Sequence, residues 1–286
     1  MSDDESPLAA TEVHYIASDH VGDEFKLFVG HCGTADSDLP APVLYITDAN
    51  GFFGSAVDII RSMQLARHLP PILVVGIGYR CGALAEAITI RTRDMTPSVD
   101  AGFVKLFPEH EALGGAPALL AFIQTELKPW VESHYPVARN DATYFGHSLG
   151  GLFGTYVLLT APETFQRYGI GSPSLWWDKE AIFTYEARYA DAHDDLPAKV
   201  FFGIGADETH EGRRREAVNH EPDLREKSTA WYIDMVDDMH RLVNRLQGRH
   251  YPSLTIASAV FPDEFHVTVP QLNLSRALRF LFDAPR

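Results

Sequence analysis

An apolar run, a tight glycine turn and a second apolar run constrain the fold of this chain most. Thr143–Phe145 predicts a buried strand, Leu149–Leu159 predicts a helix, and Gly146-His147-Ser148-Leu149-Gly150 joins them. Such a turn imposes strained backbone angles on Ser148 and brings the two backbones close together, so the flanking positions need glycine. Gly151 adds clearance. The pattern predicts a nucleophile elbow, and the alternative is a glycine-rich helix start that only packs tightly.

The rest of the chain alternates short apolar runs with helical stretches. Glu12–Ile16 and Phe25–Val29 are typical of an antiparallel hairpin, and the later runs are typical of parallel strands buried on both faces. This order predicts an α/β fold with a doubly wound, mostly parallel sheet and helices on both faces. The later strands are expected at Val43–Ile46, Ile72–Val75, Thr143–Phe145, Lys199–Phe202 and Leu254–Ile256. The helices are expected at Val57–His68, Ala116–His134, Leu149–Leu159, Lys179–Ala190, Thr229–Gln247 and Gln271–Phe282.

Length and composition favour one domain. A chain of 286 residues with 45% hydrophobic content can bury a large core, and no low-complexity linker divides it, so we expect a single domain over residues 1–286. Long connections are expected at about 79–115 and 206–228, and loops of this length are usually functional or mobile. Within the second, the charged run Glu211–Glu216 predicts a solvated loop.

Charge and cysteine content exclude several functions. A net charge of −15 argues against nucleic-acid partners, because such a surface repels phosphates. Met1–Pro7 lacks the basic and apolar regions of a signal peptide, and no apolar run is long enough to span a bilayer. We therefore expect a cytoplasmic protein without membrane association. Cys32 and Cys81 favour free thiols over one disulfide, and neither has metal-ligand spacing. The oligomeric state stays open.

A serine at an elbow needs a base, because a serine hydroxyl is a weak nucleophile at neutral pH. In sheets of this type the chain order is nucleophile, acid, histidine. His266 fits, since it follows the last predicted strand and precedes the final helix. We expect the side chain of His147 to point away from this base. A surface or packing role is expected for three other histidines, which lie on or beside polar helical stretches: His134, His240 and His250.

The orienting acid is expected after the strand Lys199–Gly205. Asp207 and Glu208 both follow it, and either carboxylate could hold the imidazole tautomer. The residues alone do not separate them. The unused carboxylate would be solvated or paired with arginines downstream.

Two backbone N–H groups should stabilise the developing oxyanion. One is expected from Leu149, directly after the serine, and the other from the loop Thr47–Phe52 after the third strand. Asn50 is the favoured donor in that loop, with Gly51 as the alternative. This chemistry needs no cofactor and no metal, and its partner is a small-molecule ester.

Six stretches form a more specific combination: Tyr45–Phe52, Val75–Tyr79, Arg91–Pro97, Gly146–Gly151, Ser172–Asp178 and Gly205–Glu208. Together they resemble the "Putative esterase" branch of the α/β-hydrolases, which contains esterase D, siderophore trilactone esterases, feruloyl esterases and mycolyl transferases. The resemblance covers most of the chain and is greatest on the siderophore-esterase side. It implies the α/β-hydrolase fold and a serine carboxylic ester hydrolase that works through an acyl-enzyme.

The resemblance also implies roles for individual residues. The family's Gly-x-x-acid pattern selects Glu208 over Asp207 as the triad acid, although some trilactone esterases use only a Ser-His dyad. The family's oxyanion loop has Asp-Gly where this chain has Asp48-Ala49.

Residues expected to bind substrate are large aromatics and arginines. Trp176 and Trp177 are expected to line an acyl or aryl pocket, although one of them is expected in the core. Arg91 and the run Arg213–Arg215 could attract an anionic ferric catecholate lactone. Phe52 and Arg93 are also expected to bind the substrate. The alternative for Arg93 is a structural ion pair with Asp94. Competing functions are a small-acyl or formylglutathione-type esterase, an acyltransferase, a peptidase and a non-catalytic binder.

Overall fold

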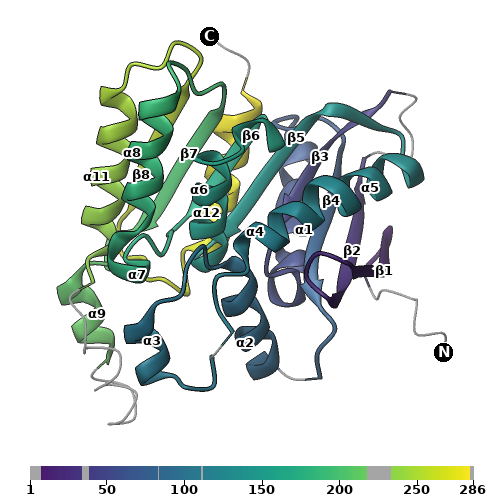
Figure 1. Ribbon diagram of the computed structural model, residues 1–286. Helices are drawn as coiled ribbons and strands as arrows, with labels where there is room; N and C mark the ends of the chain where they lie inside the picture. Colours follow the sequence, from purple (N-terminus) through teal and green to yellow (C-terminus); the bar gives the residue numbers. More distant parts are fainter. Residues whose placement is uncertain (1–7, 34–38, 83, 111, 218–232, 284–286) are drawn as a thin grey trace.

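A single eight-stranded sheet runs through the computed structural model, which describes residues 8–33, 39–82, 84–110, 112–217 and 233–283 (Figure 1). The strand order is β1-β2-β4-β3-β5-β6-β7-β8. From β4 onward all neighbours are parallel, whereas β1 pairs antiparallel with β2 and β2 antiparallel with β4. The predicted α/β-hydrolase sheet with N-terminal antiparallel strands is confirmed. The strands are β1 (Thr11–Ser18), β2 (Asp23–Cys32), β3 (Ala41–Ile46), β4 (Ile72–Tyr79), β5 (Val137–His147), β6 (Arg167–Gly171), β7 (Lys199–Gly205) and β8 (Thr255–Phe261).

Helices cover both faces of this sheet. On one face α1 packs on β2 and β4, and α12 packs on β6 and β7. On the other face α6 packs on β5 and β6, and α11 packs on β7 and β8 (Figure 1). A π-helical segment η1 joins α4 and α5, and a 3-10 turn η2 precedes β6. The helices are α1 (Ala49–Leu65), α2 (Leu84–Met95), α3 (Ala101–Leu106), α4 (Ala116–Phe122), η1 (Ile123–Leu127), α5 (Lys128–His134), α6 (Leu149–Leu158), η2 (Pro162–Thr164), α7 (Trp177–Glu180), α8 (Ile182–Ala192), α9 (His210–Ala217), α11 (Met235–Gly248) and α12 (Pro270–Phe282).

Several elements differ from the sequence prediction. Strand β6 was not predicted, because a five-residue stretch that begins with arginine and contains two glycines gives a weak strand signal. Helix α1 begins at Ala49 instead of Val57, so the expected oxyanion loop is largely the first turn of a helix. The sequence signal for the start of this helix is weak, since Asn50 and Gly51 in the first turn and Gly54 in the second are poor helix formers.

The two long connections contain helices. The first, about 79–115, holds α2 and α3, and Asp100 begins α3 by accepting hydrogen bonds from the N–H groups of Gly102 and Phe103. The charged run expected as a loop forms α9, in which Glu211 and Arg214 pair at 3.2 Å. The remainder of the second connection, 218–228, and the predicted helix start at Thr229 lie outside the described residues.

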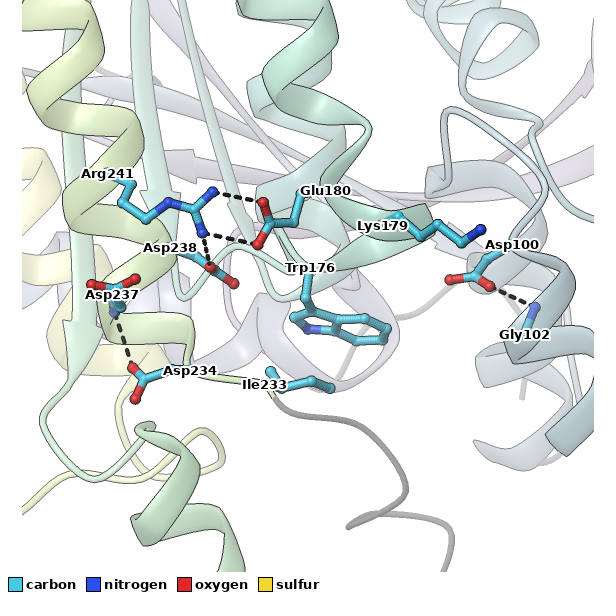
Figure 2. Close-up of a pocket in the computed structure, with 10 residues that line it drawn as sticks. All are labelled: Asp100, Gly102, Trp176, Lys179, Glu180, Ile233, Asp234, Asp237, Asp238 and Arg241. Atoms are coloured by element: carbon cyan, nitrogen blue, oxygen red, sulfur yellow. Dashed lines mark hydrogen bonds and ion pairs between the residues drawn. The ribbon is translucent and has the colours of Figure 1, made fainter.

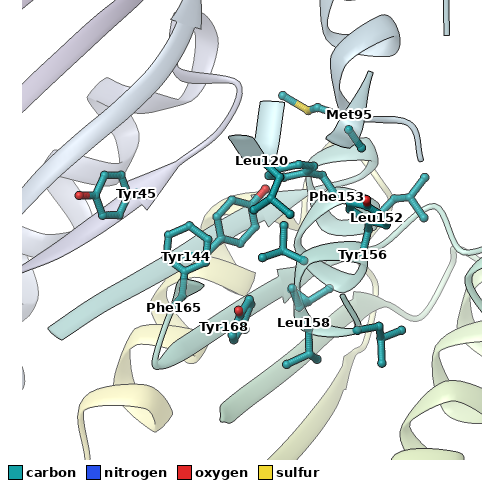
Figure 3. Close-up of a cluster of buried hydrophobic side chains, with 14 of the residues drawn as sticks. Tyr45, Met95, Leu120, Tyr144, Leu152, Phe153, Tyr156, Leu158, Phe165 and Tyr168 are labelled. Carbon is teal, nitrogen blue, oxygen red and sulfur yellow. The ribbon is translucent and has the colours of Figure 1, made fainter. Parts of the chain in front are cut away.

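The core beneath α6 fixes the position of the elbow (Figure 3). All ten residues of α6 are buried. Tyr144 on β5 packs its ring 5.9 Å from that of Phe153 on α6 and 5.3 Å from that of Phe165. Its hydroxyl donates to the Gly150 carbonyl at 2.7 Å. This contact ties the first turn of α6 to the strand that precedes it.

Candidate active site

Ser148 occupies the sharp turn between β5 and α6. Its backbone angles are φ 62° and ψ −119°, which a non-glycine residue rarely adopts. A Cβ at position 146 would collide with the Gly150 carbonyl, and a Cβ at position 150 would collide with the Thr47 hydroxyl. The glycines therefore allow the close approach that the elbow needs, as the sequence spacing predicts.

Three side chains from separate strand ends meet at this turn. His266 Nε2 lies 2.9 Å from Ser148 Oγ, and His266 Nδ1 lies 2.6 Å from Glu208 Oε2. Ser148 follows β5, Glu208 follows β7, and His266 follows β8. They meet because the carboxyl ends of parallel strands share one edge of the sheet.

Glu208 is 2% exposed and its carboxylate is fully engaged. Besides the imidazole, it accepts hydrogen bonds at Oε1 from Ser172 Oγ at 2.6 Å and from the Gly205 N–H at 2.8 Å. Asn273 Nδ2 lies 3.4 Å from Ser172 Oγ. The other candidate acid, Asp207, instead pairs with Arg215 at 3.0 Å and does not contact the imidazole through any described hydrogen bond.

Ser172 and Asn273 were not identified as site residues from the sequence. Ser172 lies in the Ser172–Asp178 motif that carried the family resemblance, and its place in that motif could have indicated a role in the site. Asn273 lies in the amphipathic helix α12 and gave no signal, because its contact with the carboxylate support depends on how α12 crosses β6 and β7.

The expectation for His147 was wrong. Its ring does not point away from the base but lies 4.7 Å from the ring of His266, between ring centres. Nε2 of His147 is 2.9 Å from the backbone carbonyl of His266, so the neutral ring donates there. Loss of hydration, followed by the nearby charge of His266, lowers the pKa of His147 well below its usual value. His147 therefore bridges the elbow to the loop that carries the candidate base.

Two helices begin beside Ser148. Leu149 is the first residue of α6, and Asn50 lies in the first turn of α1, where helical N–H groups have no partner within the helix. The N–H of Gly51 donates to the Asp48 carbonyl at 3.2 Å. The Asn50 side chain binds both backbone groups of Tyr79, through Nδ2 to the carbonyl at 2.9 Å and through Oδ1 to the N–H at 2.7 Å. This clamp fixes the start of α1 against the end of β4.

A cavity of about 300 Å³ opens at Ser148. Its walls come from the start of α1, from α2, from the end of β4 and from the start of α12, and they include Phe52, one of the predicted binding residues. Arg91 also lines it. The other residues around the cavity are Thr47, Asp48, Asn50, Gly51, Tyr79, Ala87, Ile88, Phe145, His147 and Pro270.

The other predicted binding residues lie elsewhere. Arg93 pairs with Asp94 through Nε at 2.6 Å and with Asp23 at 3.2 Å, and it is not among the residues that line the Ser148 cavity. Trp177 is 1% exposed and donates through Nε1 to the Ser98 carbonyl at 3.0 Å. Trp177 is therefore the core member of the tryptophan pair.

Trp176 lines a second cavity, of about 610 Å³, formed between α3, α7 and α11 (Figure 2). Acidic side chains dominate its wall. Arg241 pairs there with Glu180 at 2.6 Å and with Asp238 at 3.1 Å. Burial, followed by the charge of Glu180, raises the pKa of Asp238 to about 7. The remaining lining residues are Asp100, Gly102, Lys179, Ile233, Asp234 and Asp237.

Three further features bear on the sequence predictions. Cys32 and Cys81 are free. In the described part of the chain, no group of three or more acidic, histidine or cysteine side chains could hold a metal ion. None of the described helices combines the length and the hydropathy that a membrane crossing requires.

Comparison with known proteins identifies the family. A model of the family described as "Putative esterase" matches residues 34–253. Ferri-bacillibactin esterase BesA of Bacillus subtilis is 30% identical over 285 residues, covering 96% of this chain and 90% of BesA. The siderophore triacetylfusarinine C esterase of Aspergillus fumigatus is 28% identical over 250 residues, covering 85% of this chain and 82% of that enzyme.

Two solved structures have a similar fold over nearly the whole chain. The BES protein from Bacillus cereus matches with a TM-score of 0.79 at 26% identity, covering 99% of both chains. The siderophore hydrolase EstA from Aspergillus nidulans matches with a TM-score of 0.79 at 25% identity, covering 97% of both chains. The chain belongs to the "Putative esterase" family of α/β-hydrolases and is a carboxylic ester hydrolase.

Proposed function

We propose that Ser148 attacks the ester carbonyl, with His266 as general base and then general acid, and with Glu208 orienting the imidazole. The observation that carries this proposal is the unbroken contact chain, 2.9 Å from Ser148 Oγ to His266 Nε2 and 2.6 Å from His266 Nδ1 to Glu208. With Nδ1–H held by the carboxylate, Nε2 is free to accept the serine proton. Water then hydrolyses the acyl-enzyme: His266 takes a proton from the attacking water and returns it to Ser148 Oγ.

The backbone N–H groups of Leu149 and Asn50 are the proposed oxyanion donors. Both belong to first turns of helices that begin beside Ser148, and helix N-termini favour developing negative charge. Gly51 is the weaker candidate, because its N–H already donates to the Asp48 carbonyl.

The proposed substrate is an ester of a siderophore, with the cytoplasm as its site of hydrolysis. The names of the two curated relatives support this class, and the two free cysteines support a reducing compartment. Arg91 and Arg93 give this proposal little support, since both guanidinium groups are paired with carboxylates. An apolar cavity of only about 300 Å³ at Ser148 favours a second candidate, a small-acyl carboxylesterase.

Two measurements test these proposals. Ser148→Ala should abolish labelling by a fluorophosphonate probe and lower kcat on 4-nitrophenyl acetate by roughly 10⁵-fold or more, leaving only the ~10³–10⁴-fold catalysis over water that binding and oxyanion donors supply. Full retention of hydrolysis by this variant would exclude the mechanism.

The substrate class is tested with a panel of ferri-bacillibactin, triacetylfusarinine C, a feruloyl ester and 4-nitrophenyl acetate. We expect the highest kcat/KM for a siderophore. A preference for the acetyl ester would refute the siderophore proposal and favour the small-acyl esterase.

A further inference from the structure

Asp48 stands where a helix-capping residue belongs but does not cap. It is the N-cap residue of α1, and an aspartate there normally accepts a hydrogen bond from the second or third N–H of the helix. No such bond forms between the Asp48 side chain and the described start of α1. The N–H groups that the carboxylate would reach are those of Asn50 and Gly51, and the first is the proposed oxyanion donor.

Arg91 holds the Asp48 carboxylate away from the helix. Its Nε lies 2.5 Å from Oδ1 and its Nη2 lies 2.8 Å from Oδ2, so both carboxylate oxygens are engaged by one planar fork. The two side chains are 17% and 28% exposed. Burial by itself would lower the pKa of Arg91, but the charge of Asp48 and its hydrogen bonds, with smaller contributions from Tyr79 and Tyr144, together outweigh burial and raise the pKa, so Arg91 stays charged.

Asp48 has an unfavourable backbone conformation. Its angles, φ 58° and ψ 32°, are left-handed, which is unfavourable for a residue with a Cβ. Glycine would adopt them at no steric cost. A capping aspartate normally has an extended backbone, so Asp48 can cap α1 only if it also leaves the left-handed region, and its ion pair with Arg91 is made from the left-handed conformation.

We propose that Arg91 is a positioning residue that keeps the Asp48 carboxylate from capping α1, so that the Asn50 N–H stays free for the oxyanion. This inference rests on the proposed function. The pair also neutralises an acid that lies on the wall of the Ser148 cavity, where an uncompensated negative charge would oppose oxyanion formation. Arg91 thus acts through Asp48 and not by binding the substrate.

Replacing Arg91 by methionine keeps a long unbranched chain but removes the fork. Released from this pair, Asp48 should relax to the extended backbone of an N-cap residue, and its carboxylate should then cap α1. Loss of one oxyanion donor typically lowers kcat by about 10²–10³-fold. We expect Arg91→Met to lower kcat on 4-nitrophenyl acetate by about 10²-fold, with KM changed less than about threefold, because the donor acts in the transition state.

The decisive variant is the double change Arg91→Met with Asp48→Gly. Glycine suits the left-handed backbone and has no carboxylate, so it cannot cap. We expect the double variant to regain at least about tenfold in kcat over Arg91→Met alone. If Arg91 instead bound the substrate directly, removing Asp48 would give no such recovery, and the inference would be overturned.

Arg167→Met is the matched control. Arg167 is buried to the same degree as Arg91 and pairs with the more exposed Asp141, but at the amino end of β6, opposite the edge that carries Ser148. It should lose stability and keep kcat. The melting temperatures of all variants distinguish a loss of folding from a misplaced carboxylate. If Arg91→Met folds poorly, Arg91→Lys takes its place. Lysine keeps the charge without the planar fork, so its kcat should lie between those of the unaltered protein and a variant without the ion pair.

The outcomes also separate the two proposals. Failure of a fluorophosphonate to label Ser148 in the unaltered protein would reject the proposed function. Normal labelling, together with an Arg91→Met variant whose kcat stays within threefold of the unaltered protein, would reject the inference about Arg91 alone.

Discussion

Glu208→Gln should reverse the tautomer of the candidate base. Glu208 Oε1 faces two donors, the Ser172 hydroxyl and the Gly205 N–H, and Oε2 faces His266 Nδ1. A glutamine has one oxygen and one NH₂ group. Its oxygen should stay at the Oε1 position, because the Gly205 N–H cannot reverse and a buried donor left without a partner costs about 1–3 kcal/mol. The NH₂ group must then face Nδ1.

An NH₂ group at Nδ1 forces that nitrogen to accept. The imidazole proton then resides on Nε2, which lies 2.9 Å from Ser148 Oγ and can no longer take the serine proton. In a Ser-His-acid triad this tautomer lowers kcat by about 10⁴-fold, which corresponds to roughly 5 kcal/mol of transition-state stabilisation. Because the amide is isosteric and Glu208 is buried, we expect KM and the fold to change little.

The assay is steady-state hydrolysis of 4-nitrophenyl acetate, combined with the rate of fluorophosphonate labelling. Asp207→Asn is the control, since Asp207 pairs with Arg215 near the surface, and it should keep kcat within about threefold. A Glu208→Gln variant that retains kcat within tenfold would refute the tautomer argument and would indicate that a Ser-His dyad suffices.

Two further predictions concern buried polar groups. Ser172→Ala removes one charge-assisted hydrogen bond to Glu208, and bonds of this kind contribute about 1.5–3 kcal/mol. We therefore expect kcat to fall at least about tenfold with KM unchanged. An unaltered kcat would mean that the Gly205 N–H alone holds the carboxylate. Asp238 has a pKa raised to about 7 by burial and by Glu180, so its contribution to stability is complete below about 4 and is lost as the pH rises through 7. Asp238→Asn should therefore raise the free energy of unfolding at pH 8 by on the order of 1 kcal/mol but not at pH 4, and equal changes in melting temperature at both pH values would contradict this.

Much of the fold could be read from the sequence, because its signals are local. The strand, glycine turn and helix around Ser148 occupy one continuous stretch whose backbone has few alternatives. Short apolar runs separated by helices restrict the sheet to a mostly parallel, doubly wound form. The order of Ser148 and His266 along the chain, with an acid between them, follows from the same topology.

The residues that support the site could not be read in this way. The sequence left Asp207 and Glu208 equivalent in their chemistry, and only the turn after β7 directs Glu208 inward to the imidazole while Asp207 pairs with Arg215. His147 was misjudged because its direction depends on the loop carrying His266, which lies 119 residues away in the chain.

The ion pair between Asp48 and Arg91 is the clearest case. The sequence suggested that Arg91 could attract an anionic substrate, whereas the tertiary structure directs its Nε and Nη2 to the carboxylate of Asp48, the residue that precedes α1. A local pattern fixes backbone conformation through sterics and the burial of apolar faces, whereas the partner of a charged side chain is decided by which segments the completed sheet brings within hydrogen-bond distance.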